Sequence, residues 1–459
     1  MDKNAMMQTL ARAAYEKGCF NGVWLYAENG RIVSTGAYGF RDPENRLPMQ
    51  EDSVFEIASV SKQFTATAIL LLVRQGKLRL DDEITAFFPE LGAYTGVTVR
   101  HLLTHTGGVP DYCDDNDFAA WFVKVWAAEK RIPSNGDALR FLTQSGAAPV
   151  GAPGERYEYS NTGYNLLAEL VERISGVPFE DFMKKNIFAP AGMDDTAVCH
   201  VRRDGLPSDR FVRAMVLENG RYLLPEDSEE HYDEVAVDGL NGDAHVYTTV
   251  FDMLKWDRAL REEKVLTLAE QRMMYAPSLL NDGSVSGADD DRDGYGLGWG
   301  VVNDEKLGLL VSHSGGMSGI GTWFERGVDT DRAFIFANTR DYPDVRAYWS
   351  FAYGMVALSR DREPGPVESI EDLAATYTDR SLWKGLCGSY VRIDDETRWL
   401  EIYLQDGDLY WKDWNAAVKE SVLRLYQIGE KEFGFKDFDD EISVEDGSIL
   451  INGKTYKKQ

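Results

Sequence analysis

The sequence predicts an α+β fold: an antiparallel sheet flanked by helices together with a helical region, followed by a small all-β domain. Three observations predict it. Strand-like segments occur at both ends of residues 1–360, the stretch between them (about 97–275) is mostly helix and loop, and beyond 376 apolar residues alternate with polar ones. With 44% hydrophobic and 27% charged residues, the 459-residue chain has a globular composition.

The N-terminal region begins with an amphipathic helix, expected over residues 4–18, and continues as a hairpin. Val23–Ala27 and Arg31–Thr35 are rich in apolar and β-branched residues. Asn29-Gly30 separates them, and this pair tolerates the positive φ angles of a tight hairpin turn. We therefore expect two paired antiparallel strands.

Two further helices are predicted, each followed by a glycine that ends it. An apolar helix is expected from Ser59 to about Gln75, where Gly76 ends it. A second one covers residues 164–174, with Gly176 and Pro178 beyond its end.

Short apolar strands return after residue 295, separated by turns that contain Gly or Asp. They are 307–311, 320–325 and 332–337, and a helix follows at about 343–359. We expect these strands and the N-terminal hairpin to form one sheet, covered by the two terminal helices, with the helical region inserted between them.

The charged, proline-containing segment 361–375 reads as a linker, which gives a first domain of residues 1–360. Residues 376–459 are expected to form a separate small β-barrel or sandwich, similar to a lipocalin. Leu400, Ile402 and Leu404 alternate with polar residues and should face one way. Three pairs read as hairpin turns: Asp406-Gly407, Asp446-Gly447 and Asn452-Gly453.

Charge and composition exclude several partner classes. A net charge of −27 repels nucleic acid and anionic lipid. No apolar run reaches the roughly 18 residues that span a bilayer, and the first residues do not read as a secretory signal. We expect a cytoplasmic protein with reduced, mostly buried cysteines and no cofactor, which acts on a small molecule or a short peptide.

Ser59-Val60-Ser61-Lys62 opens the apolar helix and is the first candidate for chemistry. A serine hydroxyl needs a nearby base, and a lysine three positions on lies on the same helix face. The helix N-terminus adds free N–H groups that suit a developing anion. Alone the pattern is weak, because Ser381-Leu-Trp-Lys384 repeats it at the edge of the β domain.

Two more elements strengthen the assignment: Tyr159-Ser160-Asn161 before a helix, and His313-Ser314-Gly315-Gly316 at the end of a strand. In order and spacing they resemble the signature elements of class C β-lactamases and low-molecular-weight penicillin-binding proteins. The resemblance covers about residues 20–360. Its other parts are Phe55-Glu-Ile-Ala-Ser-Val-Ser-Lys-Gln-Phe-Thr-Ala, Leu102-Leu-Thr-His-Thr-Gly-Gly-Val-Pro-Asp-Tyr and Tyr295-Gly-Leu-Gly-Trp.

The resemblance implies a serine hydrolase that forms an acyl-enzyme. Ser59 attacks the carbonyl, and Lys62 and Tyr159 share the proton transfers, with Lys62 keeping Tyr159 partly ionised. The remaining roles are Asn161 for holding Lys62 and binding the substrate amide, His313 and Ser314 for binding substrate, and the N–H groups of Ser59 and Gly316 for the oxyanion hole.

His313 departs from the pattern, because most β-lactamases carry a lysine there. Sequences with His-x-Gly in this element resemble the esterases, D-aminopeptidases and some D,D-peptidases of the superfamily. A histidine, whose ordinary pKa is about 6.5, can pair with a substrate carboxylate when protonated and offers only an ordinary hydrogen bond when neutral. We therefore expect hydrolysis of a small ester or a D-amino-acid-type amide. The alternatives are a true β-lactamase or D,D-carboxypeptidase, and a binding or sensing module that acylates without turnover.

Three other patterns are weaker indications of a functional site. His101 and His105 have the spacing of a helical zinc site but lack the glutamate of a metalloprotease. Asp289–Asp293 resembles half of a calcium loop, but the twelfth position is Gly300. No metal is therefore expected. The aromatic stripe Trp121–Trp126 is equally compatible with the core and with an acyl pocket.

Overall fold

The protein is described by a computed structural model, which covers residues 2–114, 116–229, 231–289, 291–377, 380–414, 421–436, 440–445, 448–451 and 454–459. The chain forms two compact units. The first consists of Met1–Asn4 and Asn21–Asp341, and the second of Ala5–Phe20 and Tyr342–Gln459.

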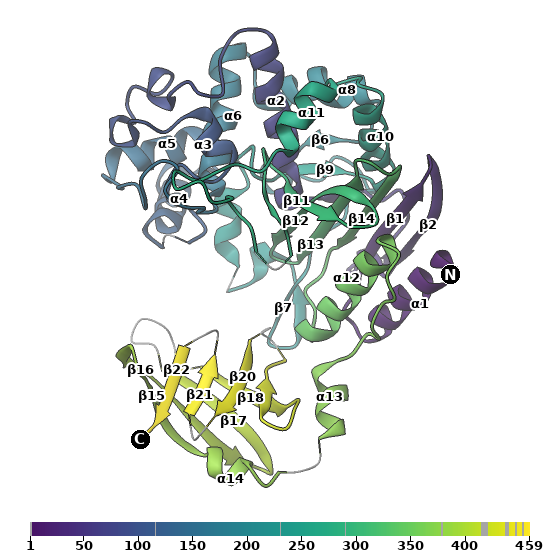
Figure 1. Cartoon of the computed structure of the whole chain (residues 1–459), viewed down its shortest axis with the longest axis vertical. Helices are drawn as coiled ribbons and strands as arrows, with labels where there is room; N and C mark the ends of the chain where they lie inside the picture. Colours follow the sequence, from purple (N-terminus) through teal and green to yellow (C-terminus); the bar gives the residue numbers. More distant parts are fainter. Residues whose placement is uncertain are drawn as a thin grey trace. The chain divides into compact units, whose positions relative to one another are not determined.

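The first unit is built on an antiparallel sheet with the strand order β10-β11-β12-β13-β14-β1-β2 (Figure 1). The strands are β10 (Gly294–Tyr295), β11 (Gly300–Asp304), β12 (Gly308–Met317), β13 (Ile320–Gly327), β14 (Arg332–Asn338), β1 (Gly22–Glu28) and β2 (Arg31–Tyr38). Because β1 pairs with β14, the N-terminal hairpin and the late strands join in one sheet, as the sequence predicts.

The hairpin turn also agrees with the sequence. Asn29 and Gly30 have φ angles of 49° and 72°, a region in which asparagine and glycine cost least. The sheet extends past the predicted strands through β10 and β11. These strands are short, and their register, Gly300 opposite Ser312, is fixed by pairing with β12.

Helices and short turns form the rest of this unit. The helices are α2 (Lys62–Arg74), α3 (Val99–Leu103), α4 (Asn116–Glu129), α5 (Asn135–Gln144), α6 (Asn161–Ser175), α7 (Phe179–Met183), α8 (Ala189–Ala191), α9 (Val201–Asp204), α10 (Val250–Arg261) and α11 (Leu268–Tyr275). α10 packs on β1 and β14, and α2 packs against α6. α2 is buried nearly all round, as its apolar sequence requires.

Small sheets connect these helices to the main sheet. The most relevant has the order β5-β9-β6, with β5 (Phe55–Glu56), β9 (Val246–Thr248) and β6 (Ala197–Val198). The others are the hairpins β3 (Phe40–Asp42) with β4 (Leu47–Pro48) and β7 (Val216–Glu218) with β8 (Arg221–Leu223).

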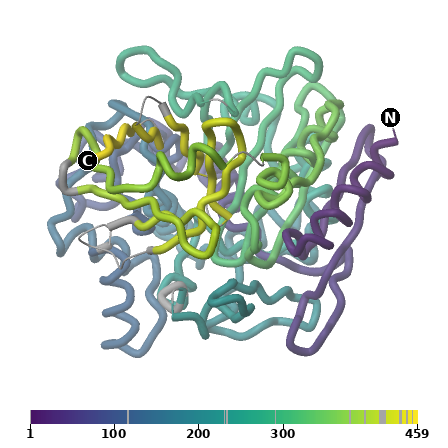
Figure 2. The backbone as a smooth tube through the Cα atoms, turned by 90° about the horizontal axis from the view of Figure 1, so that it is seen from below, coloured from purple at the N-terminus to yellow at the C-terminus, as the bar shows by residue number. Residues whose placement is uncertain are grey.

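The second unit contains α12 (Val345–Ser359), α13 (Ile370–Thr376), α14 (Trp383–Leu386) and all but the start of α1 (Lys3–Glu16). Its strands close into a barrel, the yellow and yellow-green part of Figures 1 and 2. They are β15 (Gly388–Arg392), β16 (Asp395–Gln405), β17 (Asp408–Trp414), β18 (Ser421–Gln427), β19 (Glu432–Gly434), β20 (Glu441–Glu445), β21 (Ser448–Ile451) and β22 (Lys454–Lys458).

Apolar residues that alternate with polar ones along the strands fill the core of the barrel. Leu400 and Ile402 of β16 are buried, whereas Leu404 is 42% exposed because it lies next to the turn at the end of the strand. That turn is the predicted Asp406-Gly407, with Gln405 opposite Asp408. The other two predicted turns, Asp446-Gly447 and Asn452-Gly453, lie outside the described residues.

The fold class predicted from the sequence is therefore confirmed: an α+β unit and a small closed β-barrel. Among the residues that the structure covers, none of the helices has both the length and the apolar character needed to cross a bilayer.

Candidate active site

Ser59 lies in a tight turn that leads into α2. The chain leaves β5 and forms a 3-10 turn at Ala58–Ser61 before the α-helix begins at Lys62. Ala58 has a φ of 45°, an unfavourable angle for a residue with a Cβ. The α-helix thus starts three residues later than predicted, and backbone strain is located immediately before the candidate nucleophile.

Lys62 is fully buried and its ammonium group has three acceptors. Nζ donates to Ser59 Oγ at 2.9 Å, to Asn161 Oδ1 at 2.7 Å and to the carbonyl oxygen of Asp243 at 3.1 Å. Three acceptors match the three donors of a lysine ammonium. The structure thus brings Ser59 and Lys62 together, as their spacing predicts, and places Asn161 on Lys62, as the family resemblance implies.

Burial lowers the pKa of Lys62 to about 8, although the nearby Asp243 and Asp111 act in the opposite direction. With such a pKa, about one lysine in ten is neutral at pH 7. A neutral amine 2.9 Å from a serine hydroxyl is able to accept its proton.

Asn161 is held from both ends of its amide. It is the first residue of α6, where Ser160 caps the helix by accepting a hydrogen bond from the Gly163 N–H. Asn161 Nδ2 donates to Asp111 Oδ2 at 2.9 Å, which turns Oδ1 toward Lys62. Burial raises the pKa of Asp111 to about 6. Asp111 is part of a sequence segment typical of the family, but nothing in the pattern indicated this contact.

Tyr159 lies beside the nucleophile, with its ring centre 4.9 Å from Lys62 Nζ. Removal from water raises its pKa well above the ordinary value, although a hydrogen bond with Ser59 acts in the opposite direction. The expectation that Lys62 keeps Tyr159 partly ionised is therefore corrected. Of the two groups, Lys62 has the pKa closer to neutrality.

The histidines of the zinc-like pattern support the site instead. His105 Nδ1 accepts a hydrogen bond from the Ser160 N–H at 3.0 Å, and its ring centre lies 4.1 Å from that of Tyr159. His101 Nδ1 accepts from the Thr98 N–H at the start of α3. Both histidines thus use a ring nitrogen in local structure. Within the described residues, no group of three or more metal-ligating side chains is gathered; Asp290 of the calcium-like loop lies outside them.

His313 requires a second correction. It is buried, and both ring nitrogens are occupied: Nδ1 donates to the Ser314 carbonyl at 2.5 Å, and Nε2 accepts from the Tyr295 hydroxyl at 2.9 Å. Burial and the charge of Lys62 lower its pKa to about 3. A neutral histidine with both nitrogens engaged does not pair with a substrate carboxylate, contrary to the expectation from its position.

A cavity of about 290 Å³ opens at Ser59. Asn161 and Gly316 line it, so the predicted oxyanion-hole residues Ser59 and Gly316 face the same space. Ser314 and Gly316 are exposed positions on β12. Of the aromatic stripe in α4, Phe122 is in the core and Trp121 and Trp126 pack against the core, whereas Ala119, which precedes the stripe, lines the cavity.

Asp243 is a carboxylate that no pattern in the sequence singles out. It is buried and lines the cavity, and its side chain accepts from the Tyr112 hydroxyl at 2.7 Å and from Asn165 Nδ2 at 2.6 Å. Its backbone carbonyl is the third acceptor of Lys62. Only the fold brings residue 243 to α2, so no local signal could have identified it.

Comparisons with known proteins find a matching family and relatives for most of the chain. A sequence model of the Beta-lactamase family matches residues 7–354. Penicillin-binding protein 4* of Bacillus subtilis (strain 168) is 35% identical over 342 residues, 74% of this chain and 72% of that protein. The D-alanyl-D-alanine-carboxypeptidase/endopeptidase AmpH of Escherichia coli (strain K12) is 30% identical over 313 residues, 64% of this chain and 73% of that protein.

Among solved structures, the octameric penicillin-binding protein homologue from Pyrococcus abyssi superposes with a TM-score of 0.67 and 22% identity. The match covers 100% of both chains, so the likeness in fold includes the barrel as well as the first unit.

Proposed function

Because this chain belongs to the beta-lactamase family, we propose that it is a serine hydrolase that cleaves small esters or D-amino-acid-type amides through an acyl-enzyme on Ser59. The observation that carries the proposal is the buried Lys62, whose pKa is about 8 and whose Nζ lies 2.9 Å from Ser59 Oγ. A positioned base beside a serine hydroxyl is the arrangement that nucleophilic catalysis needs.

The proposed reaction has two halves. In the first, neutral Lys62 accepts the Ser59 proton while Oγ attacks the substrate carbonyl, and the N–H groups of Ser59 and Gly316 stabilise the oxyanion. Protonated Lys62 is the stronger acid, so it returns this proton toward the leaving group, and the Tyr159 hydroxyl, which stays protonated, is placed to relay it. In the second half, water attacks the acyl-Ser59 ester and the proton transfers run in reverse.

The charges near the cavity favour substrates without a carboxylate. The side chain of Asp243 lines the cavity, and Asp111 lies behind Asn161. His313 is held neutral and does not supply a positive charge. A carboxylate close to these two acidic side chains would be repelled, although the charge of Lys62 offsets part of this effect, whereas a neutral ester or an amide with a free amino group would not be repelled.

D,D-carboxypeptidase or β-lactamase activity is the second candidate, favoured by the resemblance to AmpH, whose name states a D-alanyl-D-alanine-carboxypeptidase. Such substrates carry a free carboxylate next to the scissile amide. The neutral His313 argues for low efficiency on them.

One substrate panel tests these possibilities. Purified protein is assayed with p-nitrophenyl esters, D-amino-acid p-nitroanilides, nitrocefin and a D-alanyl-D-alanine peptide, and the acylated residue is identified by mass spectrometry. We expect turnover of the esters or anilides and acylation of Ser59. Higher kcat/KM for nitrocefin or the dipeptide would favour the second candidate, and a single burst without turnover would indicate an acyl-capturing module.

A further inference from the structure

A buried ion pair joins the two backbone segments that lead to the catalytic residues. Glu56, in β5, precedes Ser59 by three residues. His245 follows Asp243, the residue whose carbonyl accepts a hydrogen bond from Lys62, by two. Both side chains of the pair are only 3% exposed, and His245 Nδ1 lies 2.8 Å from Glu56 Oε1.

The hydrogen bonds indicate that the histidine carries a charge. Its Nδ1 faces the Glu56 carboxylate, and its Nε2 faces the carbonyl oxygen of Val237 at 3.1 Å. A carbonyl oxygen only accepts, so Nε2 carries a proton, and Nδ1 carries one as well when the Glu56 carboxylate is ionised. Although burial opposes ionisation, each partner shifts the pKa of the other toward the charged form.

Glu56 also fixes the backbone of the neighbouring segment. Its Oε1 accepts the His245 backbone N–H at 3.2 Å, and its Oε2 accepts the Tyr247 hydroxyl at 3.0 Å. Both oxygens of the carboxylate therefore accept hydrogen bonds from residues 245–247, and β5 is joined to this segment by side-chain as well as strand hydrogen bonds.

The backbone at His245 is strained. Its φ is 69°, in the left-handed region that glycine occupies readily and a residue with a Cβ does not. Gly242, three residues earlier, has a φ of 98°. The turn between them points the Asp243 carbonyl at Lys62. A strained residue persists where its surroundings hold it, and here the ion pair does so.

We propose that the Glu56–His245 pair is a positioning device for the catalytic lysine. It holds residues 243–245 in the strained turn and thereby keeps the Asp243 carbonyl on Lys62 while Lys62 contacts Ser59. The inference rests on the proposed function of Lys62, but it assigns a role to two residues that do not touch the substrate.

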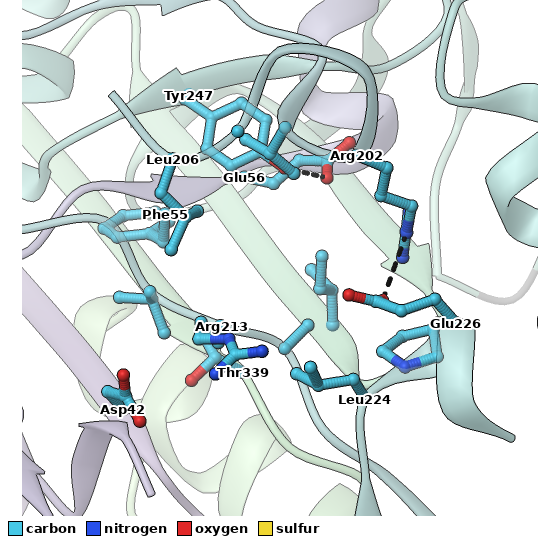
Figure 3. Close-up of a pocket in the computed structure, with 16 residues that line it drawn as sticks. Asp42, Phe55, Glu56, Arg202, Leu206, Arg213, Leu224, Glu226, Tyr247 and Thr339 are labelled. Carbon is cyan, nitrogen blue, oxygen red and sulfur yellow. Dashed lines mark hydrogen bonds and ion pairs between the residues drawn. The ribbon is translucent and has the colours of Figure 1, made fainter. Parts of the chain in front are cut away.

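A second cavity gives experimental access to the pair. It has a volume of about 310 Å³, and Glu56 and Tyr247 line one wall, beside Phe55 and Leu206 (Figure 3). Arg202, on the same wall, forms an ion pair with Glu226 at 3.6 Å (Figure 3). Removing the imidazole of His245 would leave a space next to Glu56, which borders this cavity and not the cavity at Ser59.

The decisive variant is His245→Gly. Glycine adopts the positive φ without strain, so the variant removes the imidazole and keeps the backbone conformation available. We expect kcat to fall about 10- to 100-fold with KM changed less than threefold, because a displaced catalytic group costs up to about 100-fold. Imidazole added at millimolar concentration should restore at least a third of the lost activity.

Two further variants make the test specific. Glu56→Gln removes the charge that holds the imidazolium and should reduce kcat to a similar extent, without rescue by imidazole. Tyr247→Phe removes one hydrogen bond to Glu56 and leaves the pair intact, so it should stay within about threefold of wild type. The proposal is overturned if His245→Gly keeps wild-type kcat, if imidazole does not rescue it, or if Tyr247→Phe loses as much activity.

A titration of Lys62 separates this inference from the proposed function. The lysine side chains are labelled with 13C at Cε, and Lys62 is assigned from its loss in Lys62→Met. If the pair positions Lys62, the Lys62 titration midpoint moves by at least half a pH unit in folded His245→Gly, whether or not any substrate turns over. An unchanged midpoint overturns the inference, whereas a moved midpoint in a protein without hydrolase activity overturns only the proposed function.

Discussion

The same four-residue pattern occurs in both units of the chain and has different surroundings in each. In the first unit, Lys62 is fully buried and contacts Ser59 at 2.9 Å. In the second, Ser381 and Lys384 are both exposed, at the start of the one-turn helix α14. The fold therefore removes the lysine of the pattern from water in the first unit and leaves it exposed in the second.

The physical reason is desolvation. A lysine in water is charged at pH 7 and is a poor base. Burial lowers the pKa of Lys62 to about 8, while Asn161 and the Asp243 carbonyl hold its nitrogen against the serine. Both of these partners come from segments about 100 and 180 positions away in the sequence.

The largest expected effect contrasts the two serines directly. Ser59→Ala removes the nucleophile and should reduce kcat/KM at least about a thousandfold. Ser381→Ala is the matched control and should leave kcat/KM unchanged. Steady-state kinetics on one ester give kcat/KM for both variants. An active Ser59→Ala together with an inactive Ser381→Ala would reverse the assignment of the nucleophile.

A second test asks whether the groups around Ser59 act as one unit. Lys62→Met and Tyr159→Phe should each reduce kcat by about two to four orders of magnitude, and the double variant only slightly more, because both serve one proton path. Lys384→Met should be silent. If the losses of the two single variants multiply in the double variant, Lys62 and Tyr159 act independently.

The lowered pKa of Lys62 predicts a pH profile. The neutral amine is the base, so kcat/KM for a neutral ester should rise about tenfold per pH unit below pH 8 and level off above it. A stopped-flow pH series measures this. A profile that falls between pH 6 and 8 would contradict Lys62 as the base.

Asp111→Asn sharpens this profile. Asp111 is one of the charges that raise the pKa of Lys62, so its neutralisation should move the rising limb to lower pH. A limb that moves to higher pH would show that another group titrates.

A smaller effect is expected from removing the barrel. The linker at 361–375 stays a prediction. The helix that precedes it, α12, contacts later residues of the second unit: the Val345 N–H donates to the Lys436 carbonyl, and Arg346 pairs with Glu441. A chain that ends at residue 365 should keep kcat within about tenfold and melt at a lower temperature. Insoluble or molten protein, judged by near-UV circular dichroism, would show that the two parts share one core.

The smallest effect should come from chelation. His101 and His105 use ring nitrogens in local hydrogen bonds, so EDTA should leave the hydrolysis rate unchanged. Loss of activity in EDTA that zinc or calcium restores would return attention to these histidines or to the loop near residue 290.

Local patterns in the sequence determined the elements and the identity of the motif. The strands at 23–27 and 332–337, the turn at Asn29-Gly30 and the alternation at Leu400 and Ile402 are confirmed because each depends on neighbouring residues alone. Likewise, a lysine three residues after a serine in a helical turn lies on the same face, and Lys62 contacts Ser59 as this spacing predicts.

What the sequence left open depends on burial and on contacts over long distances. The pKa values of Lys62, Tyr159 and His313 follow from the groups packed around them, so the charge of His313 could not be predicted from its type. Asp243 reaches Lys62 across 181 positions, and His245 meets Glu56 across 189. Only tertiary structure brings such residues together, because no local pattern encodes a distance through space.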